Sequence, residues 1–324
     1  MNSRAQLINQ TIKQISKKIL EQGRVDGVIG FRQGSCGYMT EPYMAKTSEA
    51  ADALIFDCNC RMNLVTYLTH RTDRAGTDKV GIVVKGCDSR NLVTHIIENK
   101  IKRDQLYIIG VPCTGLADKN ALIAAAGTNI LSIEDDGKTL FITTETGTKK
   151  IPKADVLQSN CRTCIRKNPV IYDELAGPLV AELEIKARFS DVDKIEAMAA
   201  VEKQALFDGL LSECIRCYAC RNACPLCYCP TCFVDESRPQ WVGKTCEAVD
   251  VATYHILRAF HDAGRCTDCG ACEAACPLDI KMRIFTRKTI KDCVENYGWE
   301  AGMDEKLRPA LDHFRLNDPQ AFIR

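Results

Sequence analysis

The sequence has few histidines, few aromatic residues and no long hydrophobic stretch. Its 324 residues include 5 histidines and 6% aromatic residues, and 43 basic residues stand against 42 acidic ones. Because no run of about 18 apolar residues occurs, no membrane-spanning helix is expected. Residues 1–24 carry polar residues throughout, which argues against a signal peptide. Dispersed charges of both signs form no basic surface, so we expect a cytoplasmic protein with neither a membrane span nor a nucleic-acid partner.

By contrast, the chain contains 20 cysteines. A secreted disulfide scaffold is usually short, whereas this chain is long and shows extended helical patterns without an export signal. In a reducing cytoplasm, clustered cysteines are typical metal ligands. Because histidine is scarce, the composition favours metal sites built from thiolates alone.

The first half of the chain has the pattern of an α/β domain. The expected elements are a helix over 6–20, strands over 25–31, 79–85 and 106–111, a helix over 90–100 and a three-stranded meander over 129–152. The strands over 79–85 and 106–111 are apolar throughout, which indicates a small, largely parallel sheet. Asp88 or Ser89 is the expected N-cap of the helix between them.

The pattern changes near residue 176, where the sequence becomes helical and rich in cysteine. Helices are expected over 190–211, 245–262 and 281–296, the first opening with a variant capping box at Ser190. This change predicts three units: an α/β domain over 1–175, a helical linker over 176–210 and an all-α domain over 211–324.

Two cysteine runs in the last unit share one spacing. Cys214-x2-Cys217-x2-Cys220-x3-Cys224-Pro225 recurs as Cys266-x2-Cys269-x2-Cys272-x3-Cys276-Pro277. This is the bacterial ferredoxin spacing, in which three thiolates hold one [4Fe–4S] cluster and the fourth reaches the other cluster. The predicted ligands are Cys214, Cys217, Cys220 and Cys276 for the first cluster and Cys266, Cys269, Cys272 and Cys224 for the second. Zinc is the weaker interpretation, because zinc sites use pairs of cysteines rather than triplets followed by Cys-Pro.

The long interval between the two runs carries a helical pattern and resembles an α-helical ferredoxin domain. His255 and His261 in this interval are interpreted as packing or capping residues rather than ligands. Three further cysteines, Cys227, Cys229 and Cys232, follow the first run with a spacing of no known cluster motif. They either fill space beside the clusters or hold a further cluster or zinc ion, with Cys246 or Cys293 as the fourth ligand.

The first half also contains cysteines at positions that favour a site. Cys87 and Cys113 each follow a predicted parallel strand, and sites of α/β proteins lie at this edge of the sheet. Cys161-x2-Cys164 follows the meander. These four thiols are predicted to converge on a third [4Fe–4S] cluster; the alternative is buried thiols plus a zinc-binding pair.

Several segments of residues 25–175 occur in the order seen in one known family. They are Val80-Gly-Ile-Val-Val, Ile109-Gly-Val-Pro-Cys113-Thr-Gly, the hairpin ending at Pro152 and Cys161-x2-Cys164. With these segments the chain resembles the β subunits of deazaflavin-reducing hydrogenases and deazaflavin-dependent formate dehydrogenases. The resemblance implies FAD, a [4Fe–4S] cluster on Cys113, Cys161 and Cys164, and Cys87 or Cys60 as its fourth ligand. Cys87 is the preferred fourth ligand, with Cys36, Cys58 and Cys60 in reserve.

The chain departs from this family in its flavin-binding segments. Glycines that let backbone amides approach a pyrophosphate are missing, and Gly34-Ser-Cys-Gly37 is the remaining candidate for an anion-binding loop. We therefore expect FAD to be absent or weakly held.

Together these features predict an iron–sulfur electron-transfer subunit of an anaerobic oxidoreductase complex. The expected partners are subunits like those of heterodisulfide reductases, hydrogenases or formate dehydrogenases. Two alternatives stay open: an FAD-containing catalytic subunit acting on a soluble two-electron carrier such as a deazaflavin, and a thiol/disulfide redox module.

Overall fold

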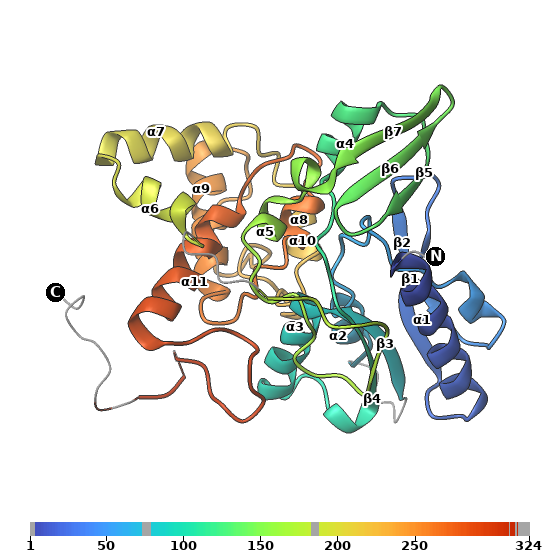
Figure 1. Cartoon of the computed structure of the whole chain (residues 1–324). Helices are drawn as coiled ribbons and strands as arrows, with labels where there is room; N and C mark the ends of the chain where they lie inside the picture. Colours follow the sequence, from blue (N-terminus) through green and yellow to red (C-terminus); the bar gives the residue numbers. More distant parts are fainter. Residues whose placement is uncertain (1–3, 73–78, 183–187, 311, 315, 317–324) are drawn as a thin grey trace.

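The computed structural model describes residues 4–72, 79–182, 188–310, 312–314 and 316. An α/β half comes first in the chain and a helical half follows it, and the two lie side by side (Figure 1). This arrangement confirms the predicted fold class. The exact domain boundaries at 175 and 210 stay predictions.

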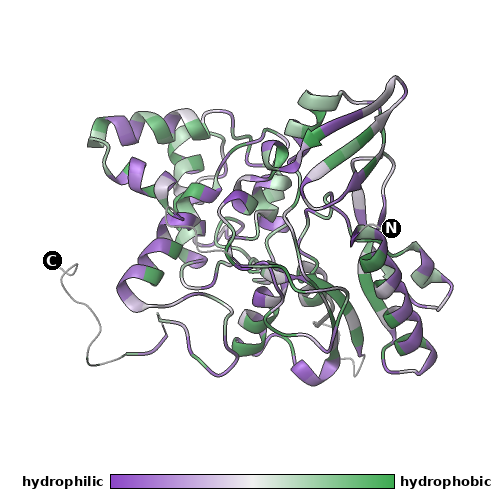
Figure 2. Cartoon of the chain, in the orientation of Figure 1, coloured by the Kyte–Doolittle hydropathy of each residue, from purple (hydrophilic) through white to green (hydrophobic). Residues whose placement is uncertain are grey.

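The main sheet has five strands in the order β2-β1-β3-β4-β8. Its strands are β1 Gly27–Gln33, β2 Thr40–Ala45, β3 Val80–Lys85, β4 Leu106–Val111 and β8 Glu174–Leu175. Four of them run parallel, and β2 pairs with β1 in the antiparallel direction at one edge. All six residues of β3 and of β4 are buried, as expected for central parallel strands. These strands carry much of the green of the central region in Figure 2.

Two helices pack on this sheet from opposite sides, α1 (Arg4–Glu21) and α3 (Gly86–Ile97). Helix α1 buries Ile8, Ile12 and its other isoleucines against the sheet, which confirms the predicted amphipathic helix. The predicted cap of α3 is wrong: the helix begins at Gly86 with Lys85 as N-cap. Asp88 instead lies in the first turn, where its buried carboxylate binds the Lys85 ammonium at 2.8 Å.

A second sheet of three antiparallel strands lies beside the first and confirms the predicted meander. Its strands are β5 Ile130–Asp135, β6 Thr139–Thr144 and β7 Gly147–Pro152. Helix α4 (Lys119–Ala126), which the sequence pattern did not predict, covers it, and Asp118 caps this helix by accepting a bond from the amide of Ala121. The remaining short elements of this half are α2 Thr66–Thr72, α5 Ser159–Arg162 and 3-10 turns at Ala50–Ala53, Arg103–Gln105 and Lys153–Val156.

The second half consists of helices and the loops that carry the cysteine runs. Its helices are α6 Ser190–Glu196, α7 Ala200–Leu211, α8 Ala219–Asn222, α9 Ala248–His261, α10 Ala271–Ala274 and α11 Arg283–Tyr297. The single helix predicted over 190–211 is wrong, because the chain becomes extended at Ala199 and the Glu202 carboxylate caps a new helix there. The capping box predicted at Ser190 is also wrong, since the N-cap is Phe189 and makes no side-chain cap bond.

The halves meet along α3, whose residues are almost all buried. The Arg90 guanidinium donates two hydrogen bonds to the carbonyl of Ala301, at 2.9 and 2.7 Å. Gly302 (φ +72°) lies so close that a Cβ there would come within 2.1 Å of the Arg90 carbonyl oxygen. The cysteine-rich half is therefore packed directly against the carboxyl edge of the parallel sheet.

Candidate iron–sulfur centres

The two cysteine runs fold into matching loops. The second residue after the first cysteine has a positive φ in both runs, 50° at Arg216 and 59° at Asp268. The fourth does too, 60° at Tyr218 and 76° at Gly270, and a one-turn helix, α8 or α10, follows. Left-handed residues reverse the chain locally, so each loop curls its thiols toward one side.

The first run comes together with the last cysteine of the second run. Burial raises the pKa of the Cys214 thiol, and the neighbouring thiols of Cys220, Cys276 and Cys217 raise it further. These are the four residues predicted for the first cluster, and the folded chain places the other three within electrostatic reach of Cys214. Such clustering of thiols destabilises their charged form unless a cation compensates it.

Polar groups surround the thiols of this first set. The amide of Ile280 donates to Cys276 Sγ at 3.4 Å, and Tyr254 Oη lies 3.3 Å from Cys220 Sγ. His255 Nε2 lies 3.4 Å from Cys214 Sγ, and burial lowers the pKa of this histidine to about 4, so it is neutral at pH 7. His255 thus lies within hydrogen-bonding distance of a predicted ligand, and its ring also packs against the ring of Tyr254. Hydrogen bonds to cluster sulfurs are among the features that set reduction potential.

The residues predicted for the second cluster line a cavity between α9, α10 and α11. Its wall includes the three remaining cysteines of the second run and the last cysteine of the first run: Cys266, Cys269, Cys272 and Cys224. Burial raises the pKa of the Cys269 thiol to about 11, and that of Cys272 still further. The structure therefore gathers the four thiols that cross-ligation predicts for one cluster.

A third cavity, of about 190 Å³, lies at the carboxyl edge of the parallel sheet. Its wall includes Cys87 in the first turn of α3, Cys113 after β4, and Cys161 and Cys164 at α5. Two amides point at these thiols, that of Gly115 at Cys113 Sγ and that of Leu116 at Cys161 Sγ, both at 3.3 Å. Three segments far apart in sequence thus bring four thiols together here.

The reserve ligands lie elsewhere. Among the described residues, the wall of the third cavity does not include Cys36, Cys58 or Cys60. Cys60 is fully buried in the main core, and its sulfur accepts from the amide of Asp57 at 3.3 Å. Cys58 packs with the meander core, and Cys36 lies in a surface loop beside Ser35. Of the two alternatives for the fourth ligand, the geometry favours Cys87 over Cys60.

Positive charge surrounds the third cavity. Arg90, Arg166 and Arg188 line it, and all three bind the Glu300 carboxylate, at 3.4, 2.8 and 2.9 Å. Burial alone would raise the pKa of Glu300, but Arg90 and its neighbours outweigh burial and hold this pKa below its usual value. Three guanidinium groups share a single carboxylate, so this group of side chains has a net positive charge. That charge would stabilise an anionic group bound in the cavity.

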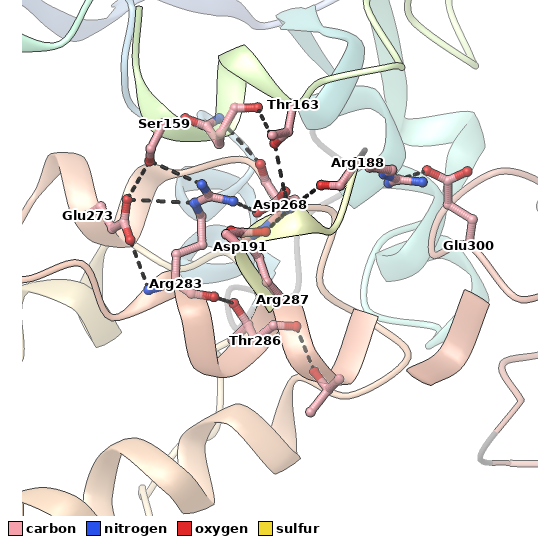
Figure 3. Close-up of polar contacts among 12 residues, drawn as sticks. Ser159, Thr163, Arg188, Asp191, Asp268, Glu273, Arg283, Thr286, Arg287 and Glu300 are labelled. Atoms are coloured by element: carbon pink, nitrogen blue, oxygen red, sulfur yellow. Dashed lines mark hydrogen bonds and ion pairs between the residues drawn. The ribbon is translucent and has the colours of Figure 1, made fainter. Parts of the chain in front are cut away.

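A buried network joins the loops of the second and third centres (Figure 3). Asp268, between two predicted ligands of the second centre, binds Arg283 at 2.5 Å and Arg287 at 2.8 Å. These arginines also donate to the third centre's loop, Arg283 to Ser159 at 3.1 Å and Arg287 to Thr163 at 3.3 Å. Their side chains come from α11, which therefore holds the two loops together.

The candidate flavin loop is engaged in other contacts. The amide of Gly34 donates to the carbonyl of Met39 at 3.0 Å, and the amide of Gly37 donates to that of Ile130 at 3.2 Å. A Cβ at Gly37 would lie 2.4 Å from the carbonyl oxygen of Leu131, so glycine here allows the loop to approach β5. Neither amide is directed at a phosphate site.

The remaining cysteines of the helical half lie in different places. Cys227, Cys229 and Cys232 line one cavity, whereas the described wall of that cavity includes neither Cys246 nor Cys293. Cys246 is exposed before α9, and Cys293 is buried within α11.

Comparison with known proteins bears on this arrangement. Residues 257–278 match the model of a 4Fe-4S binding domain, which contains the second cysteine run. The chain is 23% identical to the F420-dependent formate dehydrogenase subunit beta of Methanocaldococcus jannaschii, over 91% of this chain and 92% of the relative. It is also 23% identical to the F420-dependent formate dehydrogenase 1 subunit beta of Methanococcus maripaludis, over 91% of each chain.

One solved structure is a weaker match. A chain in a xenon-derivatised F420-reducing [NiFe] hydrogenase complex from Methanosarcina barkeri is 20% identical, with a TM-score of 0.40. The match covers 51% of this chain and 64% of that chain. The predicted resemblance to deazaflavin-dependent β subunits is confirmed by the two formate dehydrogenase relatives, and it extends beyond residues 25–175 to most of the chain. In the described part of the chain, no helix is long and apolar enough to cross a bilayer.

Proposed function

We propose that this chain is an electron-transfer subunit whose residues hold three [4Fe–4S] clusters in a row. The observation that carries the proposal is the grouping of twelve cysteines into three sets of four. Thiolate is the ligand that these clusters require, and a bound [4Fe–4S] cluster supplies one-electron redox chemistry. The amides aimed at Cys113, Cys161 and Cys276 are suited to stabilise thiolates.

The residues between the sites support their order. The first and second sites share the two runs, since Cys276 lies with the first set and Cys224 with the second. The second and third cavities share two wall residues, Thr267 and Asp268. Thr267 Oγ1 also donates to the carbonyl of Cys87 at 3.3 Å. The second site is therefore the middle one, and electrons crossing the chain would pass between neighbouring sites in the order first, second, third.

The ends of this row imply partners. Cys217 of the first site is exposed, so that end lies within reach of another protein. We propose that the partners are subunits of a cytoplasmic, anaerobic oxidoreductase complex, like those of formate dehydrogenases, hydrogenases or heterodisulfide reductases. Two relatives with high mutual coverage are formate dehydrogenase subunits, which supports this class of assembly.

A second candidate function combines the F420 dependence named in these relatives with the FAD that the family resemblance implies. An FAD-containing subunit that exchanges electrons with F420 would share their similarity over 91% of the chain. The engaged amides of Gly34 and Gly37 speak against a flavin held by that loop. The relay is therefore the better supported function.

Anaerobic purification of the full chain, followed by assays of iron, acid-labile sulfide and flavin, tests the proposal. We expect at least about twelve irons and about twelve sulfides per chain without stoichiometric flavin. About one FAD per chain with iron for fewer than three clusters would favour the F420-linked alternative. Cysteines recovered as disulfides without iron would favour the thiol/disulfide alternative.

A further inference from the structure

Three cysteines after the first run remain outside the three proposed centres. Cys227, Cys229 and Cys232 line one cavity of about 390 Å³, larger than the cavity formed by the third set of thiols. The end of α9 contributes His261 and Asp262 to the same wall. Thiol, imidazole and carboxylate groups, the usual donors to thiophilic metals, thus face one space.

The second run shows that the first of these thiols is not required by the fold. Cys224-Pro225-Leu226-Cys227 matches Cys276-Pro277-Leu278-Asp279, and both segments form the same turn. The amide of Cys227 donates to the carbonyl of Cys224 at 3.1 Å, and that of Asp279 to Cys276 at 3.3 Å. In the second run the carboxylate binds Lys281 at the surface. In the first run the equivalent side chain is a thiol directed inward.

Cys227 lies beside a ligand of the second set and a buried carboxylate. Its sulfur, the sulfur of Cys224 and a carboxylate oxygen of Asp262 all lie within 4.8 Å of one another. Asp262 is almost completely buried, and its carboxylate also forms an ion pair with Arg258 at 3.7 Å. Cys224 belongs to the second centre, so Cys227 stands at the boundary between that centre and the 390 Å³ cavity.

The rest of the motif is fixed around the same space. The amide of Asp235 donates to the carbonyl of Cys232 at 2.8 Å, which closes a turn after the third thiol. The next residue, Phe233, packs edge-to-face on the ring of His261, with centroids 4.8 Å apart. The histidine is therefore held beside the segment that carries Cys229 and Cys232.

We propose that Cys227, Cys229 and Cys232 hold a fourth, thiolate-bound metal centre, with His261 as the fourth ligand. Three cysteines and one histidine form a ligand set that zinc accepts and that iron–sulfur clusters also accept. The predicted fourth ligands Cys246 and Cys293 do not belong to the described wall. This centre uses none of the twelve cysteines of the three proposed clusters.

The test compares the metal content of full-length variants purified without oxygen. The double variant Cys229→Ser/Cys232→Ser removes two ligands while leaving Cys227 beside Cys224. Cys246→Ser is the matched control, because it also removes a cysteine of the same half that lies outside the cavity. Iron, sulfide and zinc are measured per chain, and EPR spectra of the reduced protein follow the second centre.

We expect wild type and Cys246→Ser to contain a metal complement that the double variant lacks. That complement is either about four irons with about four sulfides, which identifies a cluster, or about one zinc. The second-centre EPR signal is expected to persist in the double variant. His261→Ala, an exposed single change, should lower the occupancy of the same metal at least twofold and provides the second variant if the double variant folds poorly.

Equal metal content in wild type and the double variant would overturn the proposal, and so would loss of iron from the second centre alone. An unchanged metal content in His261→Ala would remove the histidine from the ligand set. The proposed relay is decided separately, by whether all variants retain about twelve irons in common.

Discussion

The two cysteine runs have the same spacing and the same left-handed loop positions, yet their surroundings differ. In the first run Arg216 donates to the carbonyls of Gly243 and Thr245, at 2.6 and 2.5 Å, within the helical half. In the second run Asp268 and Gly270, at the corresponding positions, face the α/β half. The shared spacing produces the same loop, whereas the residues between the cysteines determine which loop joins the third centre.

The largest expected effect tests which cluster is ligated by the last cysteine of the first run. Cys224→Ser should remove the cluster of the second run, about four irons per chain, because its side chain lies with Cys266, Cys269 and Cys272. Cys220→Ser is the matched change in the same run and should remove the first cluster instead. Iron content and EPR spectra of both variants check this. Damage confined to the first centre in Cys224→Ser would contradict cross-ligation.

The next effect concerns the contact between the loop of the second cysteine run and the α/β half. Arg287, with a side chain 1% exposed, binds Asp268, so Arg287→Gln should leave a buried carboxylate with one partner fewer. Because Asp268 keeps Arg283 as a partner, the cost should lie below about 3–5 kcal/mol, which is the cost of leaving a buried charge without any partner. Lys288→Gln on the same helix removes exposed pairs with Glu196 and Asp292 and should cost about 1 kcal/mol or less.

Anaerobic thermal unfolding of the two variants measures the difference. We expect a clearly lower Tm for Arg287→Gln than for Lys288→Gln, together with a weaker magnetic interaction between the second and third centres. Equal Tm values would show that the network seen in Figure 3 contributes little to the stability of the junction.

Changing one left-handed residue in the loop of either cysteine run should have a smaller effect on stability. Gly270 has φ +76°, and a Cβ there would lie 2.4 Å from Asn160 Oδ1. Gly270→Ala should therefore cost about 1–3 kcal/mol of the free energy of unfolding. Adding Asn160→Ala should recover the part due to the clash but not the part due to φ. Tyr218→Gly changes the corresponding position in the loop of the first cysteine run. It should leave the junction with the α/β half intact, as the EPR spectrum of the third centre would report.

The sequence predicts those features that depend on neighbouring residues. Apolar runs predict β3 and β4, and the repeated spacing predicts both runs, because each pattern fixes local geometry. Strand β2 was missed because it is an edge strand of mixed polarity that contains Pro42. The two-residue strand β8 and helix α4 carry too few periodic residues to be recognised.

Features that depend on tertiary contacts could not be predicted in this way. The choice between Cys87 and Cys60 rests on which side chain reaches the third cavity, and both lie near the same sheet. The network of Asp268 with Arg283 and Arg287 joins residues up to 124 positions apart through Thr163 and Ser159. No periodicity or spacing signals such contacts. The cap of α3 was misplaced for a related reason, since Asp88 is held by the buried Lys85 rather than by the helix end.

The smallest expected effect distinguishes the two runs by reduction potential. His255 Nε2 contacts Cys214 of the first run at 3.4 Å, and burial keeps this ring neutral by lowering its pKa to about 4. When Nε2 carries the ring proton, its N–H donates to this sulfur and stabilises the more negative, reduced form of a thiolate-bound cluster. His255→Phe should therefore lower the potential of the first centre, by up to about 60 mV, a tenfold change in a one-electron equilibrium. EPR-monitored redox titration measures it, with the second centre as internal control. Equal shifts at both centres would mean that the substitution acts through packing rather than through this contact.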